Sequence, residues 1–135
     1  MSFLTASGVG TDLLRVDRIR KALDRHGERF AKRVLCPEEL AIYRSHRDPA
    51  GYLAKAFAAK EALSKSLGTG IAGGVSFQDF LIRREPSGKP VVKVSGEAER
   101  LLREKGEQAC LLLSLSDDGD WIQAFSVLSL VAAEP

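Results

Sequence analysis

The chain has 135 residues, a net charge of +2, 44% hydrophobic residues and 28% charged residues. This balance excludes a disordered or fibrous chain and suits a single globular domain over residues 1–135. No apolar run approaches the roughly 20 residues that span a bilayer, and the first residues lack the features of a signal peptide. With 7% aromatic residues and a mild charge, nucleic-acid and membrane binding are not expected.

The two cysteines and two histidines do not form a recognisable site. Cys36 and Cys110 are far apart and have no metal-ligand spacing around them, so we expect reduced, structural cysteines in a cytoplasmic protein. His26 and His46 have no ligand partners at zinc spacing and lie in no motif that positions a catalytic base.

The first elements along the chain are a short strand and an amphipathic helix. The segment 7–14 is typical of a strand whose glycines allow another backbone to approach closely. Val16, Ile19 and Leu23 follow at helical spacing and predict a helix that ends at Gly27. One further helical turn is expected before the next proline.

The helix after the first strand is strongly basic. Between residues 15 and 33 there are eight basic side chains against three acidic ones. The basic ones are Arg15, Arg18, Arg20, Lys21, Arg25, Arg29, Lys32 and Arg33. Two interpretations stay open at this point: a solvated helix face, or a docking surface for an acidic partner.

Two prolines mark the next helices. Pro37, followed by two glutamates, predicts a helix that fades near residue 46, and Pro49 after an N-capping aspartate predicts a longer one to residue 67. Gly68 ends this central helix and begins a glycine-rich loop that runs to residue 74.

The second half of the sequence is mainly strand-like. Strands are expected at 75–82, 91–94, 110–116 and 121–131, with a short helix that ends at Gly106. The last two strands flank a hairpin turn at 117–120, and we expect Trp121 and Phe125 to be core residues. Helices followed by an antiparallel sheet predict an α+β fold, with helices packed on a small antiparallel sheet.

The central helix carries charges in unexpected places. Lys60 lies in the middle of its apolar face, and Glu61 lies at the edge of that face, four residues before Lys65. Since burying unpaired charge is costly, these residues need partners. One interpretation is an ordinary Glu61–Lys65 pair at the rim of the core. The other adds Asp12 from the first strand, because two carboxylates suit Mg²⁺, with lysines nearby to meet phosphate.

Three segments of this chain resemble a known family. They are Gly8–Leu14, Tyr52–Lys65 and Leu67–Ile71, and shorter matches follow at 75–79, 88–90 and 113–117. They are similar to holo-acyl-carrier-protein synthases, the small bacterial phosphopantetheinyl transferases. The resemblance spans nearly the whole chain, and its most specific block runs from Phe57 to Ile71.

The resemblance implies a role for each matching residue. Asp12 and Glu61 correspond to the metal carboxylates, and Lys65 to a lysine that contacts a phosphate of coenzyme A. Gly68, Thr69 and Gly70 match the ligand-binding loop, and Lys89 and Pro90 match a turn near the adenine nucleotide. Arg18, Arg25 and Arg29 correspond to contacts with the acyl carrier protein. Family members are typically homotrimers with sites between subunits.

One position departs from the family pattern. Ala56 stands where the family usually has an arginine before the Phe-Ala-Ala-Lys-Glu block. Lys55 is adjacent in sequence but about 100° away around the helix, which makes it a poor substitute. The departure puts a phosphate or partner contact in doubt.

The sequence thus predicts Mg²⁺-dependent transfer of 4′-phosphopantetheine from coenzyme A to a serine of apo-acyl carrier protein, with release of 3′,5′-ADP. Asp12, Glu61 and Lys65 are the expected catalytic residues, and Glu61 is the candidate to accept the serine proton, directly or through a water on the metal. Two alternatives stay open: another Mg²⁺-dependent phosphoryl or nucleotidyl transferase, and a non-catalytic module that docks acidic partners.

Overall fold

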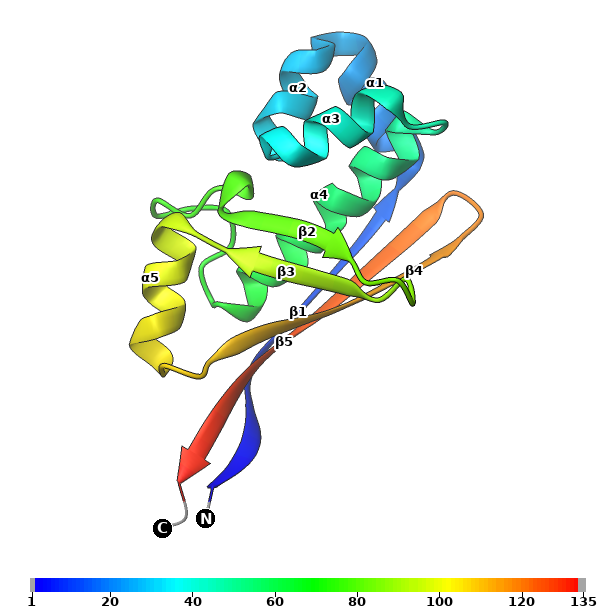
Figure 1. Ribbon diagram of the computed structural model, residues 1–135. Helices are drawn as coiled ribbons and strands as arrows, with labels where there is room; N and C mark the ends of the chain where they lie inside the picture. Colours follow the sequence, from blue (N-terminus) through cyan, green and yellow to red (C-terminus); the bar gives the residue numbers. More distant parts are fainter. Residues whose placement is uncertain (1, 134–135) are drawn as a thin grey trace.

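The computed structural model describes residues 2–133 as helices, strands and their connections (Figure 1). In chain order the elements are β1 (Ser2–Arg15), α1 (Val16–His26), α2 (Glu28–Val34), α3 (Pro37–Ser45), α4 (Pro49–Ser66), the 3₁₀ turn η1 (Phe77–Asp79), β2 (Phe80–Arg84), β3 (Pro90–Val94), α5 (Gly96–Lys105), β4 (Cys110–Asp118) and β5 (Trp121–Ala133). The α+β fold class expected from the sequence is confirmed.

The strands form two antiparallel sheets. The larger sheet has the order β1-β5-β4, so the first and last strands of the chain are neighbours, and β2 and β3 form a separate hairpin. In the larger sheet Asp12 lies opposite Ala124 and Thr11 opposite Phe125. α4 lies along one face of this sheet, and the helices α1–α3 gather at one end (Figure 1).

Two glycines bring α4 unusually close to β1. A Cβ atom on Gly10 would lie 2.0 Å from the carbonyl oxygen of Ala62, and one on Gly8 would lie 2.1 Å from that of Ser66. No side chain fits in that space, so the backbones of strand and helix pack directly together. This confirms the close approach expected from the sequence, and it places Asp12 beside the C-terminal half of α4.

The opposite face of the larger sheet is apolar and open in the single chain. Side chains that alternate with the buried positions of β1, β5 and β4 are largely exposed, and Phe125 is 46% exposed. The large apolar residues on this face include Val9, Leu13, Leu112, Trp121 and Phe125. The expectation that Trp121 and Phe125 are core residues is therefore wrong for the isolated chain, since no element covers this face among residues 2–133.

Two expected elements differ from the structure. The first strand is longer than predicted and begins at Ser2. The predicted strand at 75–82 is wrong in its first half, because Phe77–Asp79 form a 3₁₀ turn and β2 begins only at Phe80. The turn is stabilised by Asp79, whose carboxylate accepts hydrogen bonds from the backbone N–H of Ser76 and that of Ala98.

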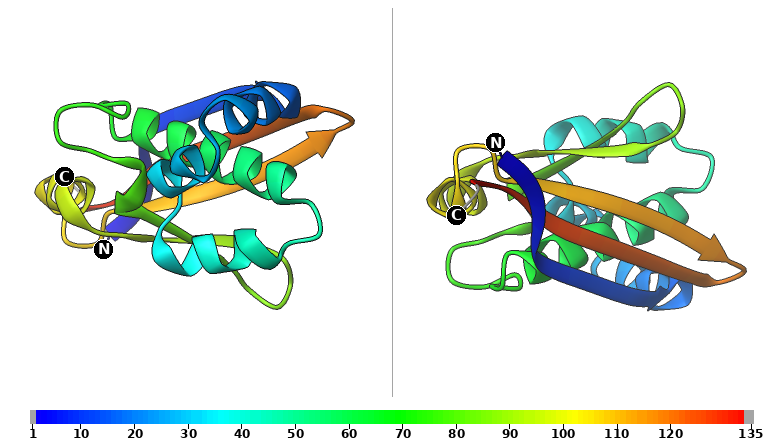
Figure 2. Two further views of the ribbon diagram at one scale, coloured as in Figure 1. Left: turned by 90° about the horizontal axis from the view of Figure 1, so that it is seen from above. Right: turned by 90° about the horizontal axis from the view of Figure 1, so that it is seen from below.

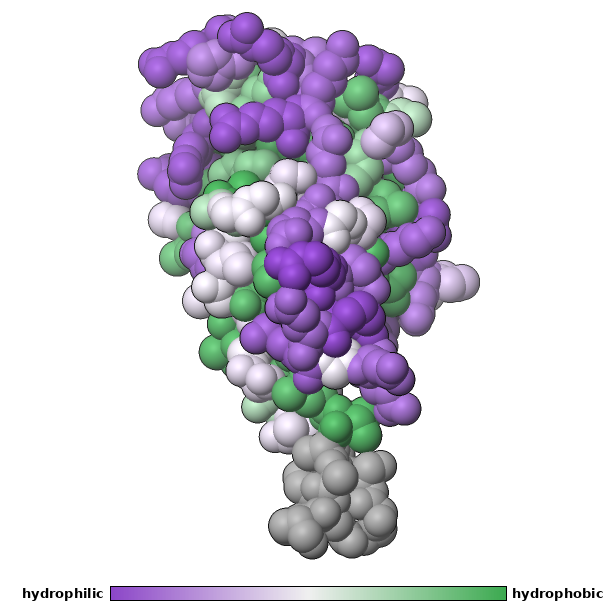
Figure 3. All heavy atoms as spheres, turned by 90° about the vertical axis from the view of Figure 1, so that its left-hand side faces the viewer, coloured by the Kyte–Doolittle hydropathy of each residue, from purple (hydrophilic) through white to green (hydrophobic). Residues whose placement is uncertain are grey.

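The surface of the helical end is predominantly hydrophilic, as Figure 3 shows from one side. Within residues 2–133 no helix has the length and apolar character that crossing a membrane requires.

Candidate active site

Asp12 and Glu61 come together where β1 packs against α4. The carboxylate of Asp12 is close enough to raise the pKa of Glu61 by repulsion. Lys65, one turn after Glu61, does not form the ordinary helix pair with it: its Nζ lies 3.3 Å from Oδ1 of Asp12 and donates to the carbonyl oxygen of Thr11 at 3.0 Å. Two carboxylates and one ammonium group thus converge from two elements distant in sequence.

One carboxylate oxygen of Asp12 is buried without a hydrogen-bond donor among the described residues. Oδ2 of Asp12 is buried and accepts no hydrogen bond from the described residues, while Oδ1 faces Lys65. A buried carboxylate oxygen without a donor is costly in a folded protein. An oxygen-seeking cation would satisfy it, and Mg²⁺ typically uses one or two protein carboxylates. The residues present therefore fit a magnesium site, although no larger group of metal-ligating side chains forms within residues 2–133.

The environment of Glu61 opposes its ionisation. Burial, and secondly the charge of Asp12, raise the pKa of Glu61 above its ordinary value, whereas Lys65 and Arg18 lower it less strongly. A negative charge beside a partly buried carboxylate raises the proton affinity of that carboxylate. A divalent cation or a proton would relieve that repulsion, so this environment suits both metal binding and proton uptake.

Arg18 extends from α1 toward the same region. Its guanidinium group lies over the ring of Phe57 on α4, 5.7 Å from the ring centroid. Phe57 also packs against the rings of Phe30 and Phe77. The basic helix is therefore fixed against α4 one turn before Glu61.

The eight basic residues from Arg15 to Arg33 divide into two groups. Four have carboxylate partners: Arg15 and Arg20 approach Asp120, and the lysines Lys21 and Lys32 pair with acids four residues earlier. The remaining four, Arg18, Arg25, Arg29 and Arg33, form no ion pair with the described residues. The three arginines that the sequence assigned to docking thus belong to the group without internal partners.

The loop after α4 is held by hydrogen bonds to the last turn of that helix. Gly68 and Gly70 have φ angles of +87° and +63°, which favour glycine. The backbone N–H groups of Thr69 and Gly70 both donate to the carbonyl oxygen of Ser64, at 3.2 and 3.1 Å. These amides close the end of α4, which places the loop directly after the Glu61–Lys65 turn.

Lys89 and Pro90 lie elsewhere in the chain. Lys89 is the last residue of the turn between β2 and β3, and Pro90 is the first residue of β3. This hairpin lies on the opposite side of α4 from β1 in both views of Figure 2. Within one chain they are not brought to Asp12 and Glu61.

A cleft of about 720 Å³ opens on the hairpin's side of α4, lined by residues of α3, α4, β2 and β4. Ala56 and Arg84 are among its lining residues. Lys55, which the sequence placed as a poor substitute for the missing arginine, also lines this cleft, and its Nζ is paired with Asp117 at 3.0 Å.

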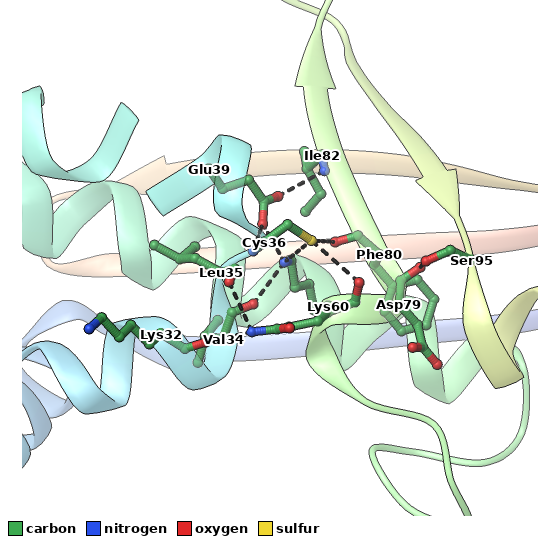
Figure 4. Close-up of polar contacts among 11 residues, drawn as sticks. Lys32, Val34, Leu35, Cys36, Glu39, Lys60, Asp79, Phe80, Ile82 and Ser95 are labelled. Atoms are coloured by element: carbon green, nitrogen blue, oxygen red, sulfur yellow. Dashed lines mark hydrogen bonds and ion pairs between the residues drawn. The ribbon is translucent and has the colours of Figure 1, made fainter. Parts of the chain in front are cut away.

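Lys60 has a separate role from its neighbour Glu61. Its side chain is fully buried, and its Nζ contacts Oε1 of Glu39 at 2.5 Å and donates to the carbonyl oxygen of Val34 at 2.8 Å (Figure 4). Glu39 in turn accepts from the backbone N–H groups of Cys36 and Ile82, each at 2.8 Å. Lys60 therefore joins α4 to α2 and, through Glu39, to α3 and β2. Its charge is compensated within the protein and needs no phosphate.

Cys36 belongs to this buried network. Its thiol lies 3.8 Å from Nζ of Lys60 and 3.4 Å from the carbonyl oxygen of Gln78. Burial raises the pKa of the thiol to about 11, so it stays protonated and unreactive at neutral pH. The expectation of a free cysteine holds, since both cysteines are unpaired.

Comparison with known proteins decides the family. Residues 8–125 match the model of the 4′-phosphopantetheinyl transferase superfamily. The chain belongs to this superfamily. It is 47% identical over 127 residues to the holo-[acyl-carrier-protein] synthase of Thiobacillus denitrificans, covering 94% of this chain and 96% of the relative. This places the chain among the holo-[acyl-carrier-protein] synthases and makes it a transferase.

Solved structures of this family have the same fold. The holo-[acyl-carrier-protein] synthase of Neisseria meningitidis matches with a TM-score of 0.85 and 40% identity, over 92% of this chain and 98% of the other. The Helicobacter pylori holo-[acyl-carrier-protein] synthase in complex with coenzyme A matches with a TM-score of 0.74 and 30% identity, over 89% of this chain and 98% of the other.

Sequence reasoning missed two features of this phosphopantetheinyl transferase. One is Asp120, which contacts α1 across about a hundred positions of sequence. The other is the cleft that Arg84 lines together with Ala56. No local pattern indicates either, because each depends on contacts between elements distant in the chain.

Proposed function

We propose that this chain forms a single domain that transfers 4′-phosphopantetheine from coenzyme A to a serine of apo-acyl carrier protein, with Mg²⁺ as cofactor and 3′,5′-ADP as the leaving product. The observation that carries the proposal is the buried Oδ2 of Asp12, which has no hydrogen-bond donor among residues 2–133, beside the carboxylate of Glu61, whose pKa is raised. Coenzyme A in the related Helicobacter pylori structure supports the donor substrate.

The three side chains have distinct tasks in this reaction. Asp12 and Glu61 would hold Mg²⁺, which, when bound, would neutralise charge on the diphosphate of coenzyme A. Glu61 has a raised pKa and is the candidate to accept the proton of the attacking serine. Lys65 lies close enough to Asp12 to be oriented by it and would stabilise negative charge on the phosphate. Gly68, Thr69 and Gly70 would contact the ligand at the end of α4.

The acyl carrier protein is expected to dock on α1 and α2. Arg18, Arg25 and Arg29 form no ion pair with the described residues, so they are available to an acidic protein. Complementary charge accelerates encounter and fixes orientation. Arg18 also contacts Phe57, which connects the docking surface to the turn of α4 that precedes Glu61.

We further propose a homotrimer with its active sites between subunits. The apolar open face of the larger sheet supports self-association, because monomers rarely leave such faces uncovered. A site between subunits would also assign a role to Lys89, Pro90 and the cleft that Ala56 lines, because the β2–β3 hairpin lies on the opposite side of α4 from β1. Neighbouring subunits could then supply the metal carboxylates and the nucleotide contacts. The expected setting is fatty-acid biosynthesis in the cytoplasm.

The direct test is incubation of the protein with apo-acyl carrier protein, coenzyme A and Mg²⁺, followed by intact-mass measurement. The proposal expects the carrier protein to gain the mass of one phosphopantetheine, and chelation of the metal to prevent the gain. A carrier protein that gains a nucleotide or a bare phosphoryl group would identify a different transferase. Binding of carrier protein without any mass change would support a docking module.

A further inference from the structure

The helix α1 begins without a capping side chain of its own. Its N-cap residue is Arg15, whose side chain cannot accept a hydrogen bond, and no side-chain cap is formed there. The first backbone N–H groups of a helix need external acceptors. In this chain they find them in the turn between β4 and β5, about a hundred residues further along the sequence.

Asp120 supplies these acceptors. Its backbone carbonyl oxygen accepts from the N–H of Val16 at 2.9 Å, and its Oδ2 accepts from the N–H of Asp17 at 3.4 Å. Its Oδ1 accepts from Nη1 of Arg20 at 3.3 Å, and Nε of Arg15 lies 3.7 Å from Oδ2. One residue therefore caps the first turn of α1 and pairs with two arginines, Arg15 at the end of β1 and Arg20 in α1.

The position of this contact matters because α1 follows β1 with no linker. β1 ends at Arg15 and α1 begins at Val16, so the angle between the strand that carries Asp12 and the helix that carries Arg18 is set at this joint. The β4–β5 turn lies beside the joint, and Asp120 is the residue of that turn that contacts α1.

We propose that Asp120 is a positioning residue, which orients α1 so that a carrier protein docked on its free arginines presents its serine to Asp12 and Glu61. This inference rests on the proposed function. Asp120 itself touches neither the metal carboxylates nor Lys65 among the contacts of the described residues.

Charge alone predicts the opposite effect, and this makes the inference testable. Removing the carboxylate of Asp120 would free Arg15 and Arg20 and make the surface more basic, so simple attraction predicts tighter binding of an acidic carrier protein. Loss of the cap instead loosens or tilts the first turn of α1 and weakens productive docking. The sign of the change in the KM for carrier protein therefore separates the two explanations.

The experiment compares D120A with D120N and the matched control D118A in the intact protein. The asparagine side chain of D120N keeps an acceptor for the N–H of Asp17, whereas the methyl group of D120A does not. Asp118 precedes the same turn and forms no ion pair with the described residues. D120A is expected to raise the KM for carrier protein about fivefold, which is the factor obtained if the stability of a typical N-cap is lost from docking, with the KM for coenzyme A unchanged. D120N and D118A should not raise it.

Hydrogen exchange gives a readout that does not depend on the reaction. The amide of Asp17, which donates to the carboxylate of Asp120, is expected to exchange faster in D120A than in the unchanged protein or in D118A. A lower or unchanged KM for carrier protein in D120A, or an equal rise for coenzyme A, would overturn the positioning role. If the unchanged protein transfers no phosphopantetheine, the proposed function itself fails, and the exchange rates alone then show whether Asp120 caps α1.

Discussion

Lys60 and Glu61 are adjacent on α4, yet the structure treats their charges in opposite ways. Lys60 is fully buried and has partners from α2, α3 and Cys36. Glu61 lies beside the carboxylate of Asp12, whose buried Oδ2 has no donor among the described residues. The comparison teaches that a charge on an apolar helix face is structural when the fold satisfies it, and points to function when the fold leaves it unsatisfied.

The largest effect is expected from E61Q. This change removes a metal carboxylate and the candidate proton acceptor, so phosphopantetheine transfer should fall by about 10²–10⁴-fold or more. Intact-mass kinetics with carrier protein and coenzyme A measure the loss, and circular dichroism checks that the fold is retained. Full activity in E61Q would show that Glu61 has no part in the mechanism, and its charge would then not differ in function from that of Lys60.

The same variant makes a prediction about stability and pH. The pKa of Glu61 is raised in the folded protein, so ionisation destabilises the fold relative to the unfolded chain at neutral pH. Without divalent cations E61Q should therefore melt at a higher temperature than the unchanged protein. This difference should vanish as the pH falls below the ordinary carboxyl value of 4.5, where both states are protonated. Added Mg²⁺ should stabilise the unchanged protein and not E61Q.

Substitution of Lys60 should destabilise the protein, whereas E61Q should stabilise it. K60M leaves Glu39 buried without its cation, which should cost about 3–5 kcal/mol of the free energy of unfolding, measured by urea denaturation. The double variant K60M/E39Q removes the stranded charge and should lose less than K60M alone. If K60M abolishes transfer without loss of stability, Lys60 belongs to the active site and its contrast with Glu61 is wrong.

The two groups of basic residues should also differ in how strongly their substitution changes the KM for carrier protein. R18E/R25E reverses two arginines that form no ion pair with the described residues and should raise the KM for carrier protein about 10–100-fold, sparing coenzyme A. K21E/K32E changes the net charge equally, at lysines already paired with acids, and serves as the matched control. Equal effects of the two variants would favour a general attraction over a defined docking surface.

The smallest effect is expected at Ala56, where the family usually has arginine. Ala56 lines the cleft on the side of α4 away from Asp12, so the longer side chain of A56R can extend into the cleft. It should lower the KM for coenzyme A about two- to fivefold, the range of a single exposed ion pair. A56M adds length without charge and should not reproduce the gain. An unchanged KM in A56R would separate this cleft from nucleotide binding.

Much of the fold could be predicted because its signals are local. Pro37 and Pro49 stand at helix starts, and Gly27 follows the end of α1, as expected from backbone preferences. The segment before β2 departs from the expected strand for a tertiary reason. Asp79 there accepts hydrogen bonds from Ser76 and from Ala98 of α5, and this contact across nineteen positions stabilises a 3₁₀ turn instead.

The candidate site could be predicted in part. The sequence, helped by the family resemblance, names Asp12 and Glu61 as a pair of carboxylates, but it does not show that they meet. For Lys65 it offers either Glu61 or a phosphate, and the structure instead pairs Lys65 with Asp12. Lys89 and Pro90 belong to the β2–β3 hairpin, which lies on the opposite side of α4 from β1 (Figure 2), so their role in nucleotide binding stays a prediction. Asp120 gives no signal, because a cap supplied from a distant turn leaves no pattern near the helix it stabilises.

The sequence by itself determined the element types, the basic character of α1 and the residues able to carry the chemistry, since these follow from backbone preference, charge and side-chain type. Only the tertiary structure decided which charge meets which partner. Gly8 and Gly10 let α4 settle against β1, and that approach places Asp12 beside Glu61, while the packing of α3 and β2 gives Lys60 to Glu39. Burial and contact decide whether a charge is satisfied, and both arise only when distant segments pack together.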